Sequence, residues 1–330
     1  PLGIFADMSG RYRFLVRAGC FFTTISSLGL YMTQDVFWMF VCRILAGVAA
    51  STWVAFTVMF TGYFPEEESG KAIARINRFN NTGKLLAFFL GSASATAFGY
   101  QAPLLMSCIT GFAAMFFSFF IKDNDSRRTP QKPRELLEVF KDVSVLVPAV
   151  LAIVLQMLMQ GTAFSFTSDV ARSIGANAVE IGVSSCLFTA TQIGAVFFLN
   201  SSWAGKQDRK NMVAAGFSLY TLYCLMVGFA PNMILMYAAQ IIGGFANAVL
   251  TSVLMASCIA YVAPEKKSTA MGLYQAIYGI GMTIGPVIMG SFVDWSGYGG
   301  AFSLFALCAL AAAIGALIFM PMVKRIKTRS

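Results

Sequence analysis

The chain opens on a short polar stretch, Gly3-Ile-Phe-Ala-Asp7-Met-Ser-Gly10-Arg11-Tyr-Arg13, which combines one carboxylate, a glycine and two guanidinium groups. Long apolar runs follow it directly. A weaker copy begins near residue 203 and reads Trp203-Ala-Gly205-Lys206-Gln-Asp208-Arg209-Lys210, with glycine where the aspartate would stand. A polar turn that recurs between apolar runs predicts a chain built from two related halves.

The composition is that of a membrane protein. Hydrophobic residues make up 57% of the 330 residues and charged residues 12%, against roughly a quarter charged in soluble proteins. The apolar segments are about 20 residues long, which suits a helix that crosses the bilayer, and they do not alternate as barrel strands do. Ten spans are predicted: 14–33, 36–62, 72–98, 101–121, 145–167, 178–200, 211–230, 232–262, 269–293 and 298–322. We therefore expect an all-α polytopic membrane protein.

Positive charge is distributed unevenly along the chain. The net charge is +9, and lysine and arginine crowd every second connection as well as the C-terminal end. By the positive-inside rule these connections are cytoplasmic, which predicts a multi-pass protein of the cell membrane with its C-terminus in the cytosol. The charges thus indicate the lipid bilayer as a partner, and they argue against nucleic acid.

Several chemistries find no residues to support them. The seven cysteines lie inside apolar segments without Cys-x-x-Cys spacing, and the chain has no histidine. Buried, isolated cysteines behave as small hydrophobic residues. The sequence also has no cluster of acids with a nucleophile in or near the spans. We expect no metal, no cofactor and no enzymatic activity.

The two halves are related by an offset of about 198 residues. Arg11 corresponds to Arg209 and Gly83 to Gly281. Both copies begin on the cytoplasmic side, which predicts a parallel repeat about an axis along the membrane normal. The charged, proline-containing stretch 122–144 is the predicted cytoplasmic linker. It separates an N-terminal bundle, 1–121, from a C-terminal bundle, 145–330.

The same offset predicts residues before Pro1. The second half begins near residue 145, so about 55 residues should precede the first one if the repeat is complete. That length corresponds to the first helix and most of the second. We expect two six-helix bundles in the intact protein, with about 10 of 12 helices in this sequence.

These features resemble the major facilitator superfamily of secondary transporters, and the resemblance covers the whole chain. In that family the loop between helices two and three follows the pattern G-x-x-x-D-x-x-G-R-x-R/K. The residues Gly3, Asp7, Gly10, Arg11 and Arg13 match that pattern position for position.

Two further motifs are similar to those of exporters in this family. Arg43, followed by Gly47, resembles helix four of proton-coupled exporters. The stretch Gly285-Pro286-Val-Ile-Met-Gly290 is similar to an antiporter signature. That signature is expected in helix five, whereas here it falls in the predicted helix eleven.

The resemblance implies a monomeric carrier in which two bundles rock around a central site, driven by an ion gradient. Similarity to drug and metabolite exporters implies efflux of a small molecule coupled to H⁺. Ion-coupled uptake of a small metabolite is the alternative, and the positive charges of Arg43 and Lys84 favour an anionic one. A non-transporting membrane receptor is a second alternative. The substrate and the direction of transport stay open.

The polar turns supply the gating candidates. A carboxylate at a helix end can pair with a guanidinium or face the N-terminus of another helix, and glycine permits the tight turn between them. Topology-setting charge is the simpler explanation for part of this set. The candidates are Asp7, Gly10, Arg11, Arg13 and Arg209.

Polar groups within the spans supply the candidates for substrate binding or coupling. A charged group at membrane depth is a functional hypothesis by default, with snorkelling to the headgroups as the alternative. Amides and tyrosines can line a midplane cavity or join neighbouring helices. The candidates are Arg43, Lys84, Asn81, Gln156, Gln160, Gln192, Gln240, Asn247, Tyr274 and Tyr278.

Small residues supply candidates for close helix packing or a hinge, since glycine lets helices approach and proline bends them. These are Gly47, Gly281, Gly285, Pro286 and Gly290. No acid lies in the middle of a predicted span. A coupling carboxylate is therefore expected before Pro1, or is Asp169 or Glu180 near the outer ends, unless the carrier is not coupled to protons.

The difference between the two polar turns can be tested. We expect Asp7→Asn to slow transport more than Gly205→Ala, because only the first turn has a carboxylate to pair with a guanidinium. Transport rates of the two full-length variants in vesicles provide the comparison. Equal rates would contradict an asymmetric gate.

Overall fold

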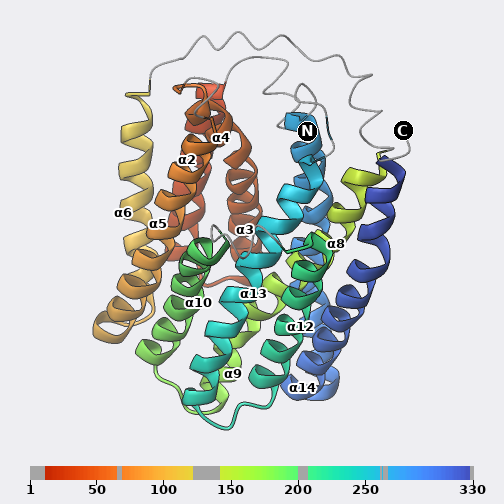
Figure 1. Ribbon diagram of the computed structural model, residues 1–330. Helices are drawn as coiled ribbons and strands as arrows, with labels where there is room; N and C mark the ends of the chain where they lie inside the picture. The colour runs from red at the N-terminus through yellow and green to blue at the C-terminus, as the bar shows by residue number, and fades with distance from the viewer. Residues whose placement is uncertain are drawn as a thin grey trace. The chain divides into compact units, whose positions relative to one another are not determined.

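Helices account for all the regular structure that can be described. A computed structural model describes residues 12–64, 69–121, 142–199, 207–260, 262 and 267–327. Within these ranges no strand is present (Figure 1). Seven helical stretches are long and apolar enough to cross a membrane, and one of them, Ala270–Pro321, contains two helices. The predicted all-α polytopic fold is confirmed.

The chain divides into two compact units, Pro1–Lys132 and Pro133–Ser330. The division falls within the stretch 122–144 that the sequence predicts as a linker. In the first unit α2 packs against α3 and α6, and α5 packs against α4 and α6. Its helices are α2 (Tyr12–Met32), α3 (Val36–Ser51), α4 (Trp53–Thr61), α5 (Ser69–Phe98) and α6 (Gln101–Ser118).

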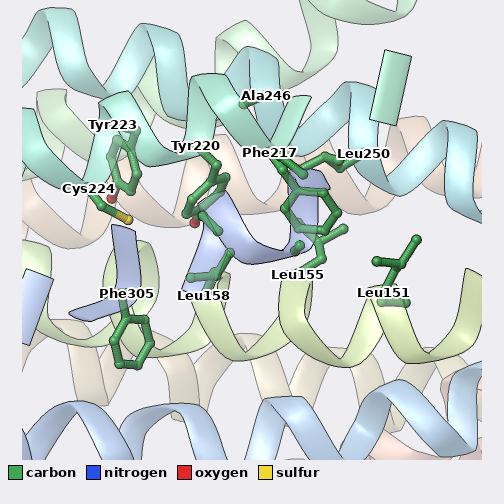
Figure 2. Close-up of a cluster of buried hydrophobic side chains, with 14 of the residues drawn as sticks. Leu151, Leu155, Leu158, Phe217, Tyr220, Tyr223, Cys224, Ala246, Leu250 and Phe305 are labelled. Atoms are coloured by element: carbon green, nitrogen blue, oxygen red, sulfur yellow. The ribbon is translucent and has the colours of Figure 1, made fainter. Parts of the chain in front are cut away.

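The second unit is built around α8, which packs extensively against α14 and also contacts α13. Figure 2 shows Phe217, Tyr220 and Tyr223 of α12 pointing towards α8, where Leu155 and Leu158 point back. The helices of this unit are α8 (Val143–Gly161), the π-helix η2 (Thr162–Phe166), α9 (Thr167–Ser173), α10 (Ala178–Leu199), α12 (Arg209–Gly228), α13 (Met233–Ile259) and α14 (Lys267–Lys327).

Glycines with positive φ make three of the turns. Gly99, Gly175 and Gly297 have φ of 83°, 90° and 69°, a region that other residues rarely adopt. Gly99 joins α5 to α6, Gly175 joins α9 to α10, and Gly297 divides α14 into two helices. Gly99 and Gly297 are 198 residues apart, which is the offset of the predicted repeat.

Two of the predicted spans differ from the structure. The segment 36–62 is not one uninterrupted helix, because α3 ends at Ser51 and α4 begins at Trp53. The hydroxyl of Thr52 donates to the carbonyl oxygen of Ala49 at 2.7 Å, and such bonds compete with the helical ladder. The segment 145–167 does not end at Thr167, because η2 carries the helix on into α9.

The contact between α8 and α14 depends on two glycines. A methyl group on Gly281 would overlap the carbonyl oxygen of Ile153, and one on Gly285 would overlap that of Met157. Small residues let membrane helices come close enough for backbone contact. The approach therefore requires glycine at both positions.

We expect Gly281→Ala to destabilise the protein by about 1–3 kcal/mol, the usual cost of adding a methyl group to a packed contact. Gly279→Ala is the matched control. It lies one half-turn away on the same helix, and a methyl group there meets nothing within 4 Å. Thermal unfolding in detergent measures both. A Gly281→Ala midpoint as high as the control's would contradict the close approach.

Candidate functional site

The buried polar side chains of the second unit are uncharged. Among the described residues of that unit, the charged side chains lie at or near helix ends. The interior therefore offers hydrogen bonds without fixed charge. Its buried polar residues are Ser144, Thr162, Thr167, Ser184, Thr189, Gln240, Asn247 and Ser257.

Two amides on α13 form the centre of the candidate site. Gln240 and Asn247 are seven residues apart and so lie on one face of the helix, where they are 2% and 4% exposed. Nε2 of Gln240 donates to Oγ of Ser184 on α10 at 2.9 Å. Oε1 of Gln240 and Oδ1 of Asn247 find no hydrogen-bond partner among the described residues. Each amide thus keeps an unused polar atom.

A third amide on the neighbouring helix has the same property. Oε1 of Gln156 on α8 is buried and has no partner within the described part of the chain, and α8 packs against α13. A buried polar atom without a partner costs about 1–3 kcal/mol. Unpaired groups of this kind call for an explanation, such as a ligand or bound water. These three amides are the strongest candidates for a polar binding surface.

The other uncharged candidates in this unit lie on α8, α10 and α14. Gln160 and Gln192 are half-buried. Tyr274 is buried and Tyr278 half-buried, and their rings meet edge-to-face at 5.4 Å. The structure gives no contact that joins these four residues to the three amides, so their part in one site stays a prediction.

The glycine candidates lie against α8 and the π-helix. Gly281 and Gly285 make the backbone contacts described above, beside Gln156. Gly290 faces the ring of Phe166, whose Cζ would lie 3.4 Å from an added methyl group. Pro286 is inside the helical part of α14, where the non-helical residue is Gly297 instead. The predicted hinge at Pro286 stays a prediction.

The candidates of the first unit are more exposed. Arg43 on α3 and Lys84 on α5 are exposed, and Asn81 is half-buried. A methyl group on Gly47 would meet nothing within 4 Å. In the described part of the chain neither Arg43 nor Lys84 forms an ion pair. Exposure suits a cavity wall or a headgroup contact equally well, so their predicted roles stay predictions.

The gating candidates can be placed only in part. Asp7, Gly10 and Arg11 lie outside the described residues. Arg13 is half-buried at the beginning of α2, and Arg209 is exposed at the first residue of α12. The gate therefore stays a prediction.

Arg17 has a structural role that sequence reasoning missed. Its Nε donates to the carbonyl oxygen of Ser118 at 3.3 Å, and Nη2 to that of Phe119 at 3.1 Å. The guanidinium also lies 5.1 Å from the centre of the Phe119 ring. The C-terminal end of a helix has carbonyl oxygens without helical partners and a partial negative charge. Arg17 therefore ties α2 to the end of α6.

The two acids proposed for coupling have structural partners. Glu180 and Asn177 exchange hydrogen bonds of 2.8 and 2.9 Å that cap the beginning of α10. Asp169 pairs with Arg172 at 3.0 Å on an exposed surface. Capping and pairing account for both carboxylates, which weakens the interpretation that either one is the coupling group.

Sequence reasoning also missed the buried hydroxyls around η2. Thr162 and Thr167 each share a hydrogen bond with a tyrosine of α12, at 3.2 Å to Tyr220 and 2.9 Å to Tyr223. The available signal was two threonines five residues apart in an apolar run, together with two tyrosines three apart. A period of 3.6 does not reveal a π turn, so the pairing could not be read from spacing.

Comparison with known proteins gives the class. The family model of the Major Facilitator Superfamily matches residues 1–168 and 149–330, and the chain belongs to this family. The human organic anion transporter MFSD10 (TETRAN) has a similar solved structure. The two superpose with a TM-score of 0.66 at 13% identity, over 95% of this chain and 83% of that one.

Two curated relatives are similar in sequence. The multi-drug resistance efflux pump PmrA of Streptococcus pneumoniae is 30% identical over 142 residues, which are 43% of this chain and 35% of PmrA. The matched stretch therefore spans about a third of that pump. The "Putative niacin/nicotinamide transporter NiaP" of Bacillus subtilis is 22% identical over 326 residues, covering 96% of this chain and 81% of NiaP.

A polar group kept for binding behaves differently from one kept for stability. We expect Asn247→Leu to leave the thermal midpoint unchanged or to raise it, because it removes an unpaired buried atom. Thr167→Val is the contrast, since it breaks a satisfied pair and should lower the midpoint. A clear loss of stability in Asn247→Leu would show that the amide has a structural partner.

Proposed function

We propose that this protein is a secondary active transporter that exports a small solute by alternating access of the rocker-switch type, coupled to H⁺. The observation that carries the proposal is the set of three amides on the neighbouring helices α8 and α13, called here the amide surface, where Gln156, Gln240 and Asn247 each keep an unused buried oxygen. Inside a membrane-spanning bundle such atoms would become available to a polar solute when the helices separate during alternating access.

The chemistry of this surface suggests what it binds. Amides and hydroxyls without charge recognise hydrogen-bonding groups rather than a net charge. A neutral or weakly cationic solute fits this half better than an anion does. An anionic substrate would need Arg43 or Lys84 of the first unit, and it is the alternative within the class.

The direction of transport is part of the proposal. Export is supported by the similarity to PmrA, which is named as an efflux pump. Uptake by symport is the second candidate, supported by the longer match to a protein named as a niacin/nicotinamide transporter. We propose a monomeric carrier of the cell membrane, not an enzyme, with bundles 1–121 and 145–330 joined by the linker 122–144 and the C-terminus in the cytosol.

We expect the full-length protein in proteoliposomes to exchange labelled for unlabelled solute. The probes are ethidium as a cation, nicotinamide as a neutral amide and fluorescein as an anion. An interior made acidic should accelerate uptake of the transported probe, because an antiporter exchanges outgoing protons for incoming solute. Acceleration by an acidic exterior would identify a symporter instead.

Two outcomes would contradict the proposal more deeply. Saturable binding without exchange of any probe would indicate a receptor. Transport of fluorescein that is lost in Arg43→Ala and Lys84→Ala, with no transport of ethidium or nicotinamide, would establish the anionic alternative and displace the amide surface as the recognition site.

A further inference from the structure

The span 143–173 contains a π turn, which is the one π-helical segment in the part of the chain that the structure describes. It joins α8 to α9 without ending the helix. A π turn is widened by one extra residue, is rare, and is found often at functional sites. In a bilayer the backbone must satisfy its own hydrogen bonds, so such a turn requires local support.

Two threonines support the π turn at its ends. Oγ1 of Thr162 donates to the carbonyl oxygen of Leu158 at 2.7 Å, and Oγ1 of Thr167 donates to that of Thr162 at 3.0 Å. The second bond reaches back five residues and so closes the wide turn from the side chain. Both threonines are buried.

Two tyrosines of α12 complete these hydrogen bonds. Tyr220 lies 3.2 Å from Oγ1 of Thr162, and Tyr223 lies 2.9 Å from Oγ1 of Thr167. Each threonine has one proton, which the backbone carbonyl receives, so each tyrosine hydroxyl is the donor to its threonine. Both tyrosines are 0% exposed, and Figure 2 shows their hydroxyls directed towards α8.

The π turn packs against α10 and α14, and the hydroxyl pairs attach it to α12. The ring of Phe188 on α10 lies 6.1 Å from that of Phe164 and 6.2 Å from that of Tyr223. These aromatic contacts fill space and do not depend on hydroxyl groups. The register of the backbone, by contrast, is held where Thr162 and Thr167 bond to carbonyl oxygens.

The register of the turn decides which way α8 and α9 face relative to each other. One residue of an α-helix corresponds to a rotation of about 100°. Gln156 and Gln160 precede the turn, and the segment Thr167–Ser173 follows it. A turn that changes between π and α geometry would re-orient one segment against the other.

We propose that η2 is a hinge within the transport cycle and that Tyr220 and Tyr223 are the latch that holds one of its registers. The two tyrosines are positioning residues, because they act through Thr162 and Thr167 on the amides of α8 and not on the solute. The inference rests on the proposed transport function and adds the moving element within one bundle.

Removing the tyrosine hydroxyls tests the latch. The variants Tyr220→Phe and Tyr223→Phe keep the aromatic rings and lose only the hydroxyl groups. The measurement uses a probe that the wild type transports. We expect the maximal transport rate of that probe to fall at least fivefold. Its dissociation constant should change less than twofold. Tyr237→Phe on α13 is the control, because no described residue is shown bonding to that half-buried tyrosine's hydroxyl. Equal maximal rates in all three variants would overturn the latch.

Deleting Ala163 tests the hinge itself, because it removes the extra residue and allows a continuous α-helix. We expect the probe to bind while transport falls at least tenfold. Wild-type transport by this variant would overturn the hinge. If the deletion variant does not fold, hydrogen exchange of Tyr223→Phe decides, since faster exchange at amides 163–168 supports the hinge and unchanged exchange overturns it. If the wild-type protein transports none of the probes, the proposed transport function is refuted. The hydrogen-exchange rates at amides 163–168 do not depend on transport, so they test the hinge separately.

Discussion

The absence of water in the hydrocarbon core is the constraint on which the rest of this structure depends. Each backbone group must find its partner within the protein, so the spans are helices and several irregularities are supported by side chains. The break at Thr52 is accompanied by a hydroxyl bond to Ala49, and the π turn by bonds from Thr162 and Thr167. Arg17 satisfies carbonyl oxygens at the end of α6. At these three places a side chain bonds to backbone carbonyl oxygens.

The same constraint gives meaning to the polar atoms that remain unpaired. Oε1 of Gln156, Oε1 of Gln240 and Oδ1 of Asn247 are buried without a hydrogen-bond partner among the described residues. The buried threonines beside the π turn, in contrast, are paired. This difference separates polar groups that stabilise the second unit from polar groups that are available to a solute, and it is the physical basis of the proposed binding surface.

The span 143–173 combines a rigid part and an adaptable part. Between Ile153 and Met157 it packs backbone to backbone against Gly281 and Gly285, where no side chain can yield. Beyond Gly161 the helix widens into η2 and is attached to α12 through two pairs of hydroxyls. A close glycine contact permits little rotation, whereas a hydrogen bond can be exchanged. Any movement within this helix is therefore expected at η2.

The sequence by itself determined the class of fold, because apolar length and the placement of charge follow from the cost of exposing polar groups to lipid. The chain also belongs to the family that Gly3, Asp7, Gly10, Arg11 and Arg13 resemble. Single positions were less predictable. The pairing of Tyr223 with Thr167 and the attachment of Arg17 to α6 depend on which helix lies opposite. Only the tertiary structure decided these contacts, since hydropathy measures the preference of a segment for lipid and carries no information about its neighbours.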